Sequence, residues 1–311
     1  MDQAEGLRAL IEKQKEGIGS PSPLPADRGD VSLDRFPRVL SVTSGKGGVG
    51  KTNVVANLAF AFTRIGKRVL VLDADLGLAN MDILLGLTPH YTIEHLFKGR
   101  KISDILIKGP GGMSIMPASS GVLDLVDLNE SQKLFLLNEI DLISEGVDVL
   151  LIDTGAGISS NVMYFNIAAQ ESIVIVTPEP TSITDAYALI KVLSTRFRKK
   201  EFLILVNLVE DALEAEEVFR KISRVADRFL ETLSIDFLGF IPLDKKLPMA
   251  VRHQRPVLEF FPKATSSRSF MELAKAILER PLRSGGFGSV QFFWKRLLQC
   301  DHHYHQEGER V

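Results

Sequence analysis

The chain has 311 residues, of which 45% are hydrophobic, 24% charged and 7% aromatic, and this balance excludes a disordered, collagen-like or coiled-coil protein. Its 37 Lys and Arg residues against 39 Asp and Glu give a net charge of −2, so no overall attraction draws it to nucleic acid or acidic lipid. A single cysteine, Cys300, an N-terminus without a signal-peptide pattern, and apolar runs far shorter than about 20 residues predict a cytoplasmic protein that does not span a membrane.

The first predicted element is a short N-terminal helix, residues 1–16. It places Ala4, Leu7 and Leu10 at helical spacing among charged residues. Residues 17–37, rich in Gly, Ser and Pro, are predicted to be a flexible linker.

Seven short apolar runs then alternate with longer helix-compatible segments, from residue 38 to residue 280. Strands that are apolar on both faces indicate a buried parallel sheet with helices on both sides. We therefore expect a doubly wound, three-layer, mostly parallel α/β domain that binds its ligand at the carboxyl ends of the strands. The predicted strands are residues 39–43, 68–73, 113–116, 147–153, 172–177, 202–208 and 237–241.

A phosphate-binding loop follows the first predicted strand and precedes a predicted helix. Its glycines allow backbone N–H groups to converge on phosphate oxygens, while Lys51 reaches the β- and γ-phosphates and the Thr52 hydroxyl can bind Mg²⁺. The expected nucleotide-binding residues here are Gly45, Lys46, Gly47, Gly48, Val49, Gly50, Lys51 and Thr52.

A second lysine, Lys46, follows the first glycine and is not needed to hold phosphate within one subunit. The stretch KGGVGKT, residues 46–52, resembles the deviant Walker A motif of the MinD/ParA family of dimerising P-loop ATPases. That resemblance implies ATP and Mg²⁺ as cofactors and an ATP-sandwiched homodimer in which Lys46 reaches the partner subunit's nucleotide. A cation supplied across an interface can act as an arginine finger does, so dimerisation would stimulate a weak ATPase.

Two acids, Asp73 and Asp75, end the second predicted strand and share a face if the strand persists. Their mutual repulsion is costly unless Mg²⁺ or lysine charge is near. The stretch resembles switch I of the family, which implies that Asp75 positions or polarises the attacking water. The same resemblance assigns Asp73 to the metal surroundings and Asn80 to contacts near the phosphates. A pair of aspartates that caps a loop is the alternative.

A further acid, Asp153, ends the fourth predicted strand and resembles a Walker B aspartate, which can hold Mg²⁺ through water. The expected metal-binding residues are thus Thr52, Asp73 and Asp153. Most MinD-like proteins carry Ser-Pro-Ala-Gly after this aspartate. The form found here, DTGAG at residues 153–157, instead resembles the flagellar-number regulators of the family, the FlhG group, also called FleN or YlxH.

Base and dimer contacts are assigned by the same resemblance. It implies that Asn207 reads the amide edge of adenine and that Pro242, Leu243 and Asp244 pack beside the ring, with ordinary turn residues as the alternative. No guanine-reading Asn-Lys-x-Asp motif is present, which favours ATP over GTP. The residues implied at the dimer face are Lys46, Glu179, Thr181 and Asp185.

The C-terminal end is predicted to be a linker at residues 281–289, an amphipathic helix at 290–300 and a polar tail at 301–311. Apolar and aromatic residues recur at helical spacing beside a cationic pair, which suits reversible binding to an anionic membrane surface, doubled in a dimer. Docking on the globular body or in a partner's groove is the alternative. We expect a peripheral location on the inner face of the cytoplasmic membrane. The predicted membrane residues are Phe292, Phe293, Trp294, Lys295, Arg296, Leu297 and Leu298.

The N-terminal stretch DQAEGLR, residues 2–8, resembles the activator helix of the FlhG group, which stimulates the signal-recognition-particle-type GTPase FlhF. The resemblance implies that Gln3 enters the partner's active site, since a glutamine can orient an attacking water. A polar helix without a role is the alternative. The implied function is regulation of flagellar number and placement. Flagellar switch or C-ring proteins, or a flagellar transcriptional activator, are further candidate partners.

Two other functions compete with this interpretation. A partition ATPase of the ParA type would bind DNA nonspecifically as an ATP dimer, and a basic cluster at residues 196–200 could contact phosphates. Charge that complements a helix C-terminus explains the same cluster, so we do not expect nucleic acid as a partner. A nucleotide-dependent scaffold that regulates a transcription factor without needing hydrolysis is the other alternative.

Overall fold

The computed structural model describes residues 37–75, 80–91, 93–117, 135, 138–139, 142–143, 146–230 and 233–281. Gln3, the predicted N-terminal helix, the predicted membrane residues 292–298 and the polar tail lie outside these residues.

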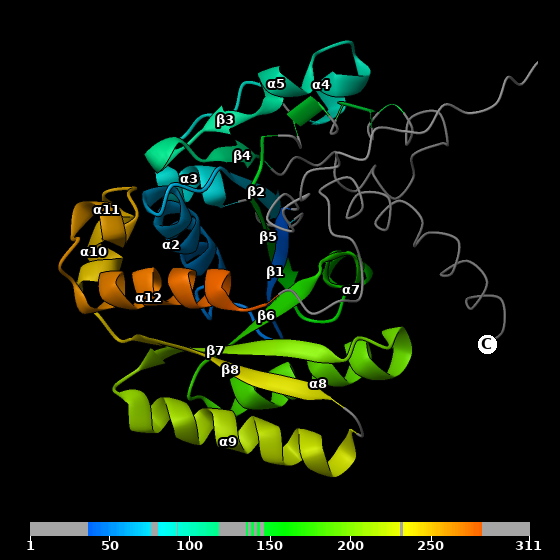
Figure 1. The fold of residues 1–311 in the computed structure, drawn as a ribbon, viewed down its shortest axis with the longest axis vertical. Coiled ribbons are helices and arrows are strands. Elements are labelled where there is room, and N and C mark those ends of the chain that lie inside the picture. Colours follow the sequence, from blue (N-terminus) through cyan, green and yellow to red (C-terminus); the bar gives the residue numbers. More distant parts are fainter. Residues whose placement is uncertain are drawn as a thin grey trace, which may run out of the picture. The chain divides into compact units, whose positions relative to one another are not determined.

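One sheet organises the described part of the chain, with eight strands in the order β3-β4-β2-β5-β1-β6-β7-β8. Every neighbouring pair is parallel except β3 and β4 (Figure 1). The strands are β1 (Arg38–Ser44), β2 (Val69–Ala74), β3 (Ile107–Lys108), β4 (Ser114–Met116), β5 (Val149–Ala156), β6 (Glu171–Val176), β7 (Glu201–Val209) and β8 (Ser234–Pro242).

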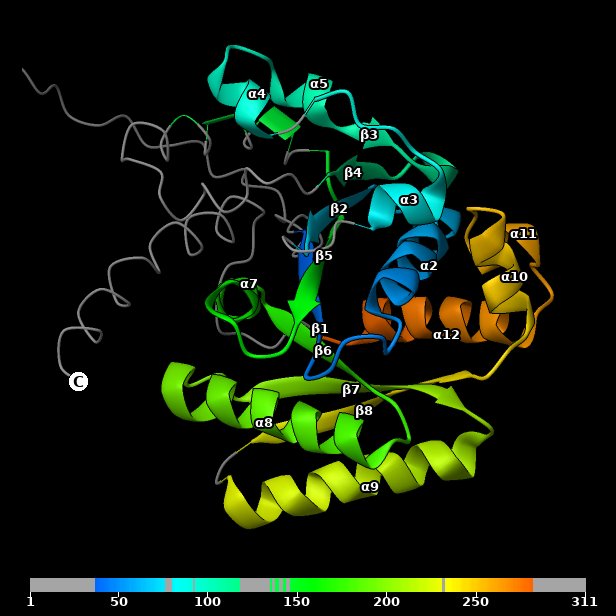
Figure 2. The same ribbon diagram turned by 180° about the vertical axis from the view of Figure 1, so that it is seen from behind.

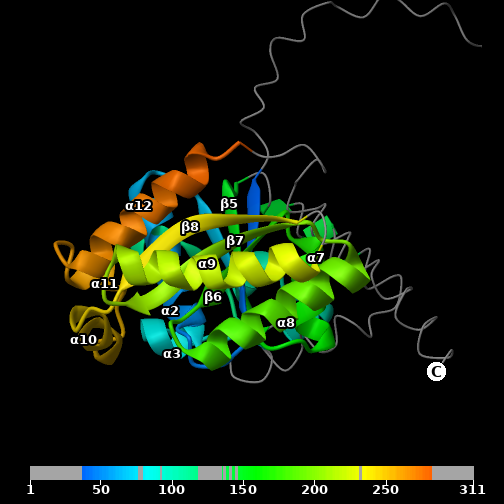
Figure 3. The same ribbon diagram turned by 90° about the horizontal axis from the view of Figure 1, so that it is seen from below.

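Helices cover both faces of this sheet, so the predicted three-layer α/β architecture is confirmed. Helices α2 and α12 lie on one face, beside α10 and α11, and α7, α8 and α9 lie on the other (Figures 1 and 2); Figure 3 shows the arrangement from the side of α8 and α9. The helices are α2 (Lys51–Arg64), α3 (Met81–Leu85), α4 (Ile93–Phe97), α5 (Ile102–Ile105), α7 (Ser160–Ala168), α8 (Pro180–Phe197), α9 (Ala212–Phe229), α10 (Lys246–Arg252), α11 (Val257–Phe260) and α12 (Thr265–Glu279), with a 3₁₀ turn at Pro110–Gly112.

The core is split by the sheet because successive side chains of a strand point to opposite faces. In β1, Leu40 and Val42 pack into the cluster shared with α2 and α12, whereas Val39 packs into a cluster with α7. A third cluster joins β6 and β7 to α8 and α9. Buried residues on both faces explain why these strands are continuous apolar runs in the sequence.

All seven predicted strands are present, and their ends differ from the predicted ends by up to three residues. β8 begins at Ser234 rather than at residue 237, because its first residues, on an edge strand, are mixed polar and apolar. β5 continues to Ala156, past the predicted end at Asp153. β3 was not predicted, since two residues are too short for a pattern to detect, and it makes the only antiparallel pairing in the described sheet.

The parallel strands β1, β2 and β5 place their carboxyl ends at one edge of the sheet. β5 lies between β1 and β2, and Asp73 and Asp153 are register partners at that edge. The loop after β1 begins at the same edge, so residues about 80 positions apart in sequence meet there.

Candidate nucleotide site

The phosphate loop joins β1 to α2, and it ends in a left-handed glycine. Gly50, with φ 89°, takes the N-cap position, and Lys51 is the first residue of α2. Gly48, with φ 80°, is left-handed as well. Glycine adopts these conformations at no steric cost, which leaves the N-terminal N–H groups of α2 facing the loop. The geometry is that of an anion-binding loop.

Two buried ionisable groups, Lys51 and Asp153, interact at this loop. Lys51 is 8% exposed, and burial lowers the pKa of its ammonium while Asp153 and Asp75 oppose that change. Burial, reinforced by nearby Asp73, raises the pKa of Asp153 to about 8, against the influence of Thr52 and Lys51. Within the described residues, neither side-chain oxygen of Asp153 has a hydrogen-bond partner. A fully buried carboxyl that has the Thr52 hydroxyl nearby but no well-formed hydrogen bond fits a role in holding a cation or its water shell.

Asp73 lies beside Asp153, at the end of β2. Burial raises its pKa to about 6, although its two oxygens accept hydrogen bonds from the backbone N–H groups of Asp75 and Met81 at 3.3 Å each. β2 ends at Ala74, so Asp75 lies beyond the strand and does not share its alternation with Asp73. Asp75 instead lies against Gly155: its Oδ1 would be 3.6 Å from a Cβ added there.

The donor set fits Mg²⁺ bound together with a nucleotide. Thr52, Asp73 and Asp153 offer only oxygen ligands, the type that Mg²⁺ prefers. The described residues contain no group of three His, Cys, Asp or Glu side chains placed to hold a metal by themselves. Mg²⁺ in phosphate-loop sites takes few protein ligands and keeps waters and phosphate oxygens, so this sparse set suits it.

The second lysine of the loop contacts the start of α8. Lys46 Nζ donates to Glu179 Oε2 at 2.6 Å and to Thr181 Oγ1 at 3.1 Å. A Cβ added to Gly45 would lie 2.1 Å from the backbone carbon and oxygen of Asp185. The structure thus gathers the four residues assigned to the dimer face, because the loop packs directly on the backbone of α8. Their role between two subunits stays a prediction.

Asn207, predicted to read the base, contacts the phosphate loop from β7. Its Nδ2 donates to Val49 O at 2.8 Å, and its Oδ1 accepts from the N–H of Leu208 at 3.0 Å. Leu208 has φ 63° and stands where the β7–β8 register shifts. Leu243, 67% exposed, follows β8 at the same edge. The base-binding role of these residues stays a prediction.

Asp244 ties two helices together. Its Oδ1 accepts from Lys246 N at 2.8 Å, and its Oδ2 accepts from Ser266 N at 3.0 Å and Ser266 Oγ at 2.8 Å. Partial burial raises its pKa, but these donors prevail and the net pKa is lowered. The side chain therefore caps the beginnings of α10 and α12, while Pro242 is the buried last residue of β8.

Two residues near the site carry no signal in the sequence. Leu208 is a bulky residue within an apolar run, and its left-handed backbone appears only in the structure. Gln254, with φ 54°, donates from Nε2 to Ile83 O at 2.8 Å and so ties the turn after α10 to α3. Asn80, predicted to contact the phosphate region, is exposed at the start of α3 and makes no capping hydrogen bond with its side chain.

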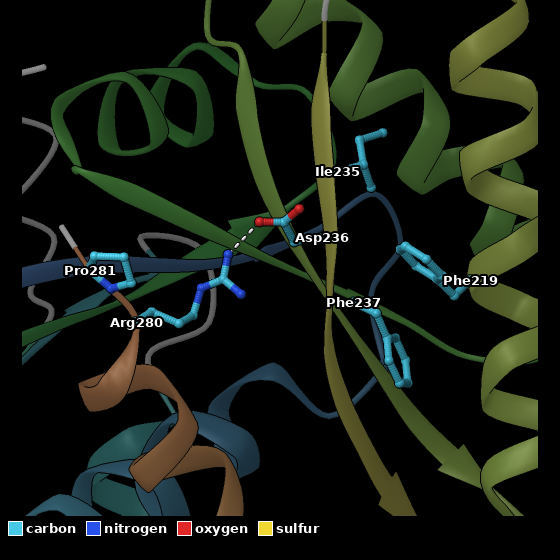
Figure 4. A pocket seen from close by; sticks show the side chains of 6 residues that line it. All are labelled: Phe219, Ile235, Asp236, Phe237, Arg280 and Pro281. Atoms are coloured by element: carbon cyan, nitrogen blue, oxygen red, sulfur yellow. Dashed lines mark hydrogen bonds and ion pairs between the residues drawn. The ribbon is translucent and has the colours of Figure 1, made fainter. Parts of the chain in front are cut away.

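A separate hollow of about 490 Å³ lies beside the first residues of β8. Asp236 and Arg280 pair on one side of the strand, where Pro281 also lies, and Phe219, Ile235 and Phe237 lie on the other side (Figure 4). Because β8 runs parallel to its neighbour β7, and β7, β6 and β1 are parallel in turn, the beginning of β8 lies at the edge of the sheet opposite the phosphate loop. The residues that line the hollow are Phe219, Ile235, Asp236, Phe237, Arg280 and Pro281.

One lysine of the basic cluster at residues 196–200 has partners within the fold. Lys199 Nζ donates to the carbonyls of Asn166 and Ala169 at 2.6 and 3.0 Å, which satisfies the end of α7. Arg198, with φ 58°, is the C-cap of α8.

No helix in the described ranges is both long enough and apolar enough to cross a membrane.

Comparison with known proteins identifies relatives along most of the chain. A model of the ParA family, described as "NUBPL iron-transfer P-loop NTPase", matches residues 35–278. The antiactivator FleN of Pseudomonas aeruginosa is 45% identical over 263 residues, which are 84% of this chain and 94% of FleN. The flagellum site-determining protein YlxH of Helicobacter pylori is 32% identical over 267 residues, 84% of this chain and 90% of YlxH.

Solved structures agree. A chain of the MinC:MinD cell division protein complex from Aquifex aeolicus matches with a TM-score of 0.60 and 28% identity, over 81% of this chain and 100% of that one. The septum site-determining protein MinD from Pyrococcus horikoshii, complexed with Mg-ADP, matches with a TM-score of 0.61 over 78% of this chain and 97% of that one. At 24% identity, this second match bears on the fold alone.

Proposed function

The chain belongs to the MinD/ParA family of P-loop NTPases, and on that premise we propose that it is a weak, Mg²⁺-dependent ATPase that dimerises around ATP. In this proposal the dimer binds the membrane reversibly and regulates the number and placement of flagella. The observation that carries it is the phosphate loop with two lysines: Lys51 is buried beside Asp153, and Lys46 lies on the surface against α8.

The residues divide the work of phosphoryl transfer between them. Lys51 and the N–H groups of α2 hold the phosphates, and Thr52 and Asp153 hold Mg²⁺, directly or through water. Mg²⁺, when bound, neutralises charge on the phosphate oxygens. Asp75, beside Gly155, accepts a hydrogen bond from the attacking water and orients it. Lys46 of the partner subunit supplies the last cation, so hydrolysis requires the dimer.

The flagellar role rests on the relatives and on the two ends of the sequence. FleN is named an antiactivator and YlxH a flagellum site-determining protein. The resemblance of residues 2–8 to the activator helix of the FlhG group supports stimulation of the GTPase FlhF through Gln3. The aromatic face at residues 292–298 supports attachment to an anionic membrane, where two copies in a dimer bind more strongly than one. Flagellar switch proteins or a transcriptional activator would then be recruited to the dimer.

Co-sedimentation with anionic vesicles tests the membrane switch. The full chain should pellet with ATP and Mg²⁺ but stay in the supernatant with ADP, and a chain truncated after Pro281 should stay in the supernatant with either nucleotide. Equal pelleting with ATP and with ADP, or pelleting of the truncated chain, would contradict the proposal. Absence of pelleting with either nucleotide would favour docking of the C-terminal helix on a protein, or DNA binding by the dimer.

The trans role of Lys46 has its own test. Lys46→Ala should bind ATP with unchanged affinity yet remain monomeric in light scattering and lose stimulated hydrolysis. Lys67→Ala, which removes an exposed lysine on the turn after α2, is the matched control and should dimerise normally. If Lys46→Ala dimerises at the same protein concentration as the wild type, Lys46 has no role across the dimer interface.

The partition alternative rests on the basic cluster at residues 196–200. Lys199 donates to two carbonyls of its own fold and Arg198 ends α8, which supports a structural role for these two residues. Binding of the ATP-loaded full chain to duplex DNA at moderate salt would favour the partition function instead.

A further inference from the structure

The contact between Lys46 and α8 lies within a single chain, although the proposed dimer needs this lysine across the interface. Resting on that proposed function, we propose that Glu179 is a positioning residue that, with Thr181, holds Lys46 in its own subunit until ATP of the partner subunit displaces it. We call the contact of Lys46 with Glu179 and Thr181 the lysine latch.

The latch is anchored on a fixed backbone. Gly45 approaches α8 so closely that even a Cβ would overlap the backbone of Asp185, so loop and helix are packed backbone to backbone. Glu179 and Thr181 lie at the start of that helix. The backbone positions of the latch residues are therefore set by the fold, and the contact can open by a change of side-chain rotamer, with the long side chain of Lys46 reaching away from α8. Two of the three donors of its ammonium are used in the latch.

Glu179 has no competing structural task in the described part of the chain. It holds the N-cap position of α8, yet its side chain makes no capping hydrogen bond. Its carboxylate points to Lys46 at 2.6 Å instead. A residue retained only to cap the helix would direct its oxygen to the N–H groups of the first turn.

The strength of the latch suits a contact that must open. The side chains of Lys46 and Glu179 are 39% and 61% exposed, so solvent screens the pair. One latch therefore favours the bound over the released state of the Lys46 side chain by about threefold. A nucleotide with several negative charges outcompetes a single carboxylate for the same ammonium. Because two latches open in each dimer, removal of Glu179 should lower the dissociation constant of the dimer by about tenfold.

The first test measures the latch in the full chain without nucleotide. Acylation of Lys46, followed by mass spectrometry, should be about threefold faster in Glu179→Gln than in the wild type, and Glu179→Asp should restore part of the protection. Glu217→Gln, which removes an exposed partner of Lys221 at 3.8 Å, should leave the rate at Lys46 unchanged. Equal rates at Lys46 in Glu179→Gln and the wild type would overturn the latch.

The second test measures its consequence. In sedimentation equilibrium with ATP and Mg²⁺, on an Asp75→Ala background that blocks hydrolysis, Glu179→Gln should dimerise at about tenfold lower protein concentration than its parent. An equal or weaker dimer means that Glu179 does not restrain Lys46, and the proposal fails. If the parent forms no ATP dimer, the proposed function fails instead, and the acylation rates still report whether Glu179 holds the lysine.

Discussion

Replacement of the first glycine of the phosphate loop should damage the fold as well as nucleotide binding. In Gly45→Ala the new Cβ would lie 2.1 Å from the backbone carbon and oxygen of Asp185 and 2.6 Å from the N of Ala186. Ordinary contacts to a Cβ are longer than 3.4 Å, so loop and helix must separate by more than 1 Å. Overpacking costs about 1–3 kcal/mol, and the upper value applies because the obstacle is helix backbone rather than a rotatable side chain.

Gly47→Ala is the matched control, since no atom lies within 4 Å of its added Cβ and its φ is not positive. Urea denaturation followed by far-ultraviolet circular dichroism, without nucleotide, should show Gly45→Ala to be destabilised by about 3 kcal/mol, or a midpoint roughly 6–12 °C lower on heating. Gly47→Ala should stay within about 1 kcal/mol of the wild type. Equal stability of the two variants would refute the close packing of loop on α8.

Three further changes test buried and capping charges by the same denaturation assay. In EDTA, Asp153→Asn should stabilise the chain by up to about 4 kcal/mol at pH 7, because a carboxyl whose pKa rises from 3.8 to about 8 takes up a proton on folding; the gain should shrink as pH falls toward 4. Asp244→Asn should cost about 1 kcal/mol at pH 7, and the loss should fade as pH drops below 3.8 toward the lowered native pKa. Arg38→Met should lower the free energy of unfolding by about 3 kcal/mol, since it leaves the carboxylate of Glu171 and two carbonyls at the end of α12 without their donor.

Much of the fold could be predicted because a buried parallel strand is readable as a continuous apolar run. β1 and β6 are buried nearly throughout, and both were predicted to within one residue at each end. β8 was placed less well because it lies at the edge of the sheet, where partly exposed positions weaken the pattern. β3 has two residues and owes its existence to pairing with β4, which no local pattern encodes.

The candidate site divides in the same way. Lys51 and Thr52 are defined by spacing within one loop, and Asp153 by the strand before it, so local sequence sufficed to place them. The contact of Gly45 with Asp185 joins residues 140 positions apart, and that of Asn207 with Val49 spans 158. Such contacts depend on how the sheet is wound. A shared face for Asp73 and Asp75 was expected only if the strand persisted, and β2 ends at Ala74, one residue before Asp75.

The packing of the phosphate loop links nucleotide binding to the surface that carries the proposed interface. Asn207 holds the loop from β7 through Val49, while Gly45 packs on the second turn of α8 and Lys46 contacts its beginning. A shift of the loop must therefore move or release α8, since interiors transmit displacement rather than absorb it. The start of α8 carries Glu179 and Thr181, both exposed. We therefore expect occupancy of the phosphate site to act on those surface residues, which is the coupling that the proposed ATP-dependent dimer requires.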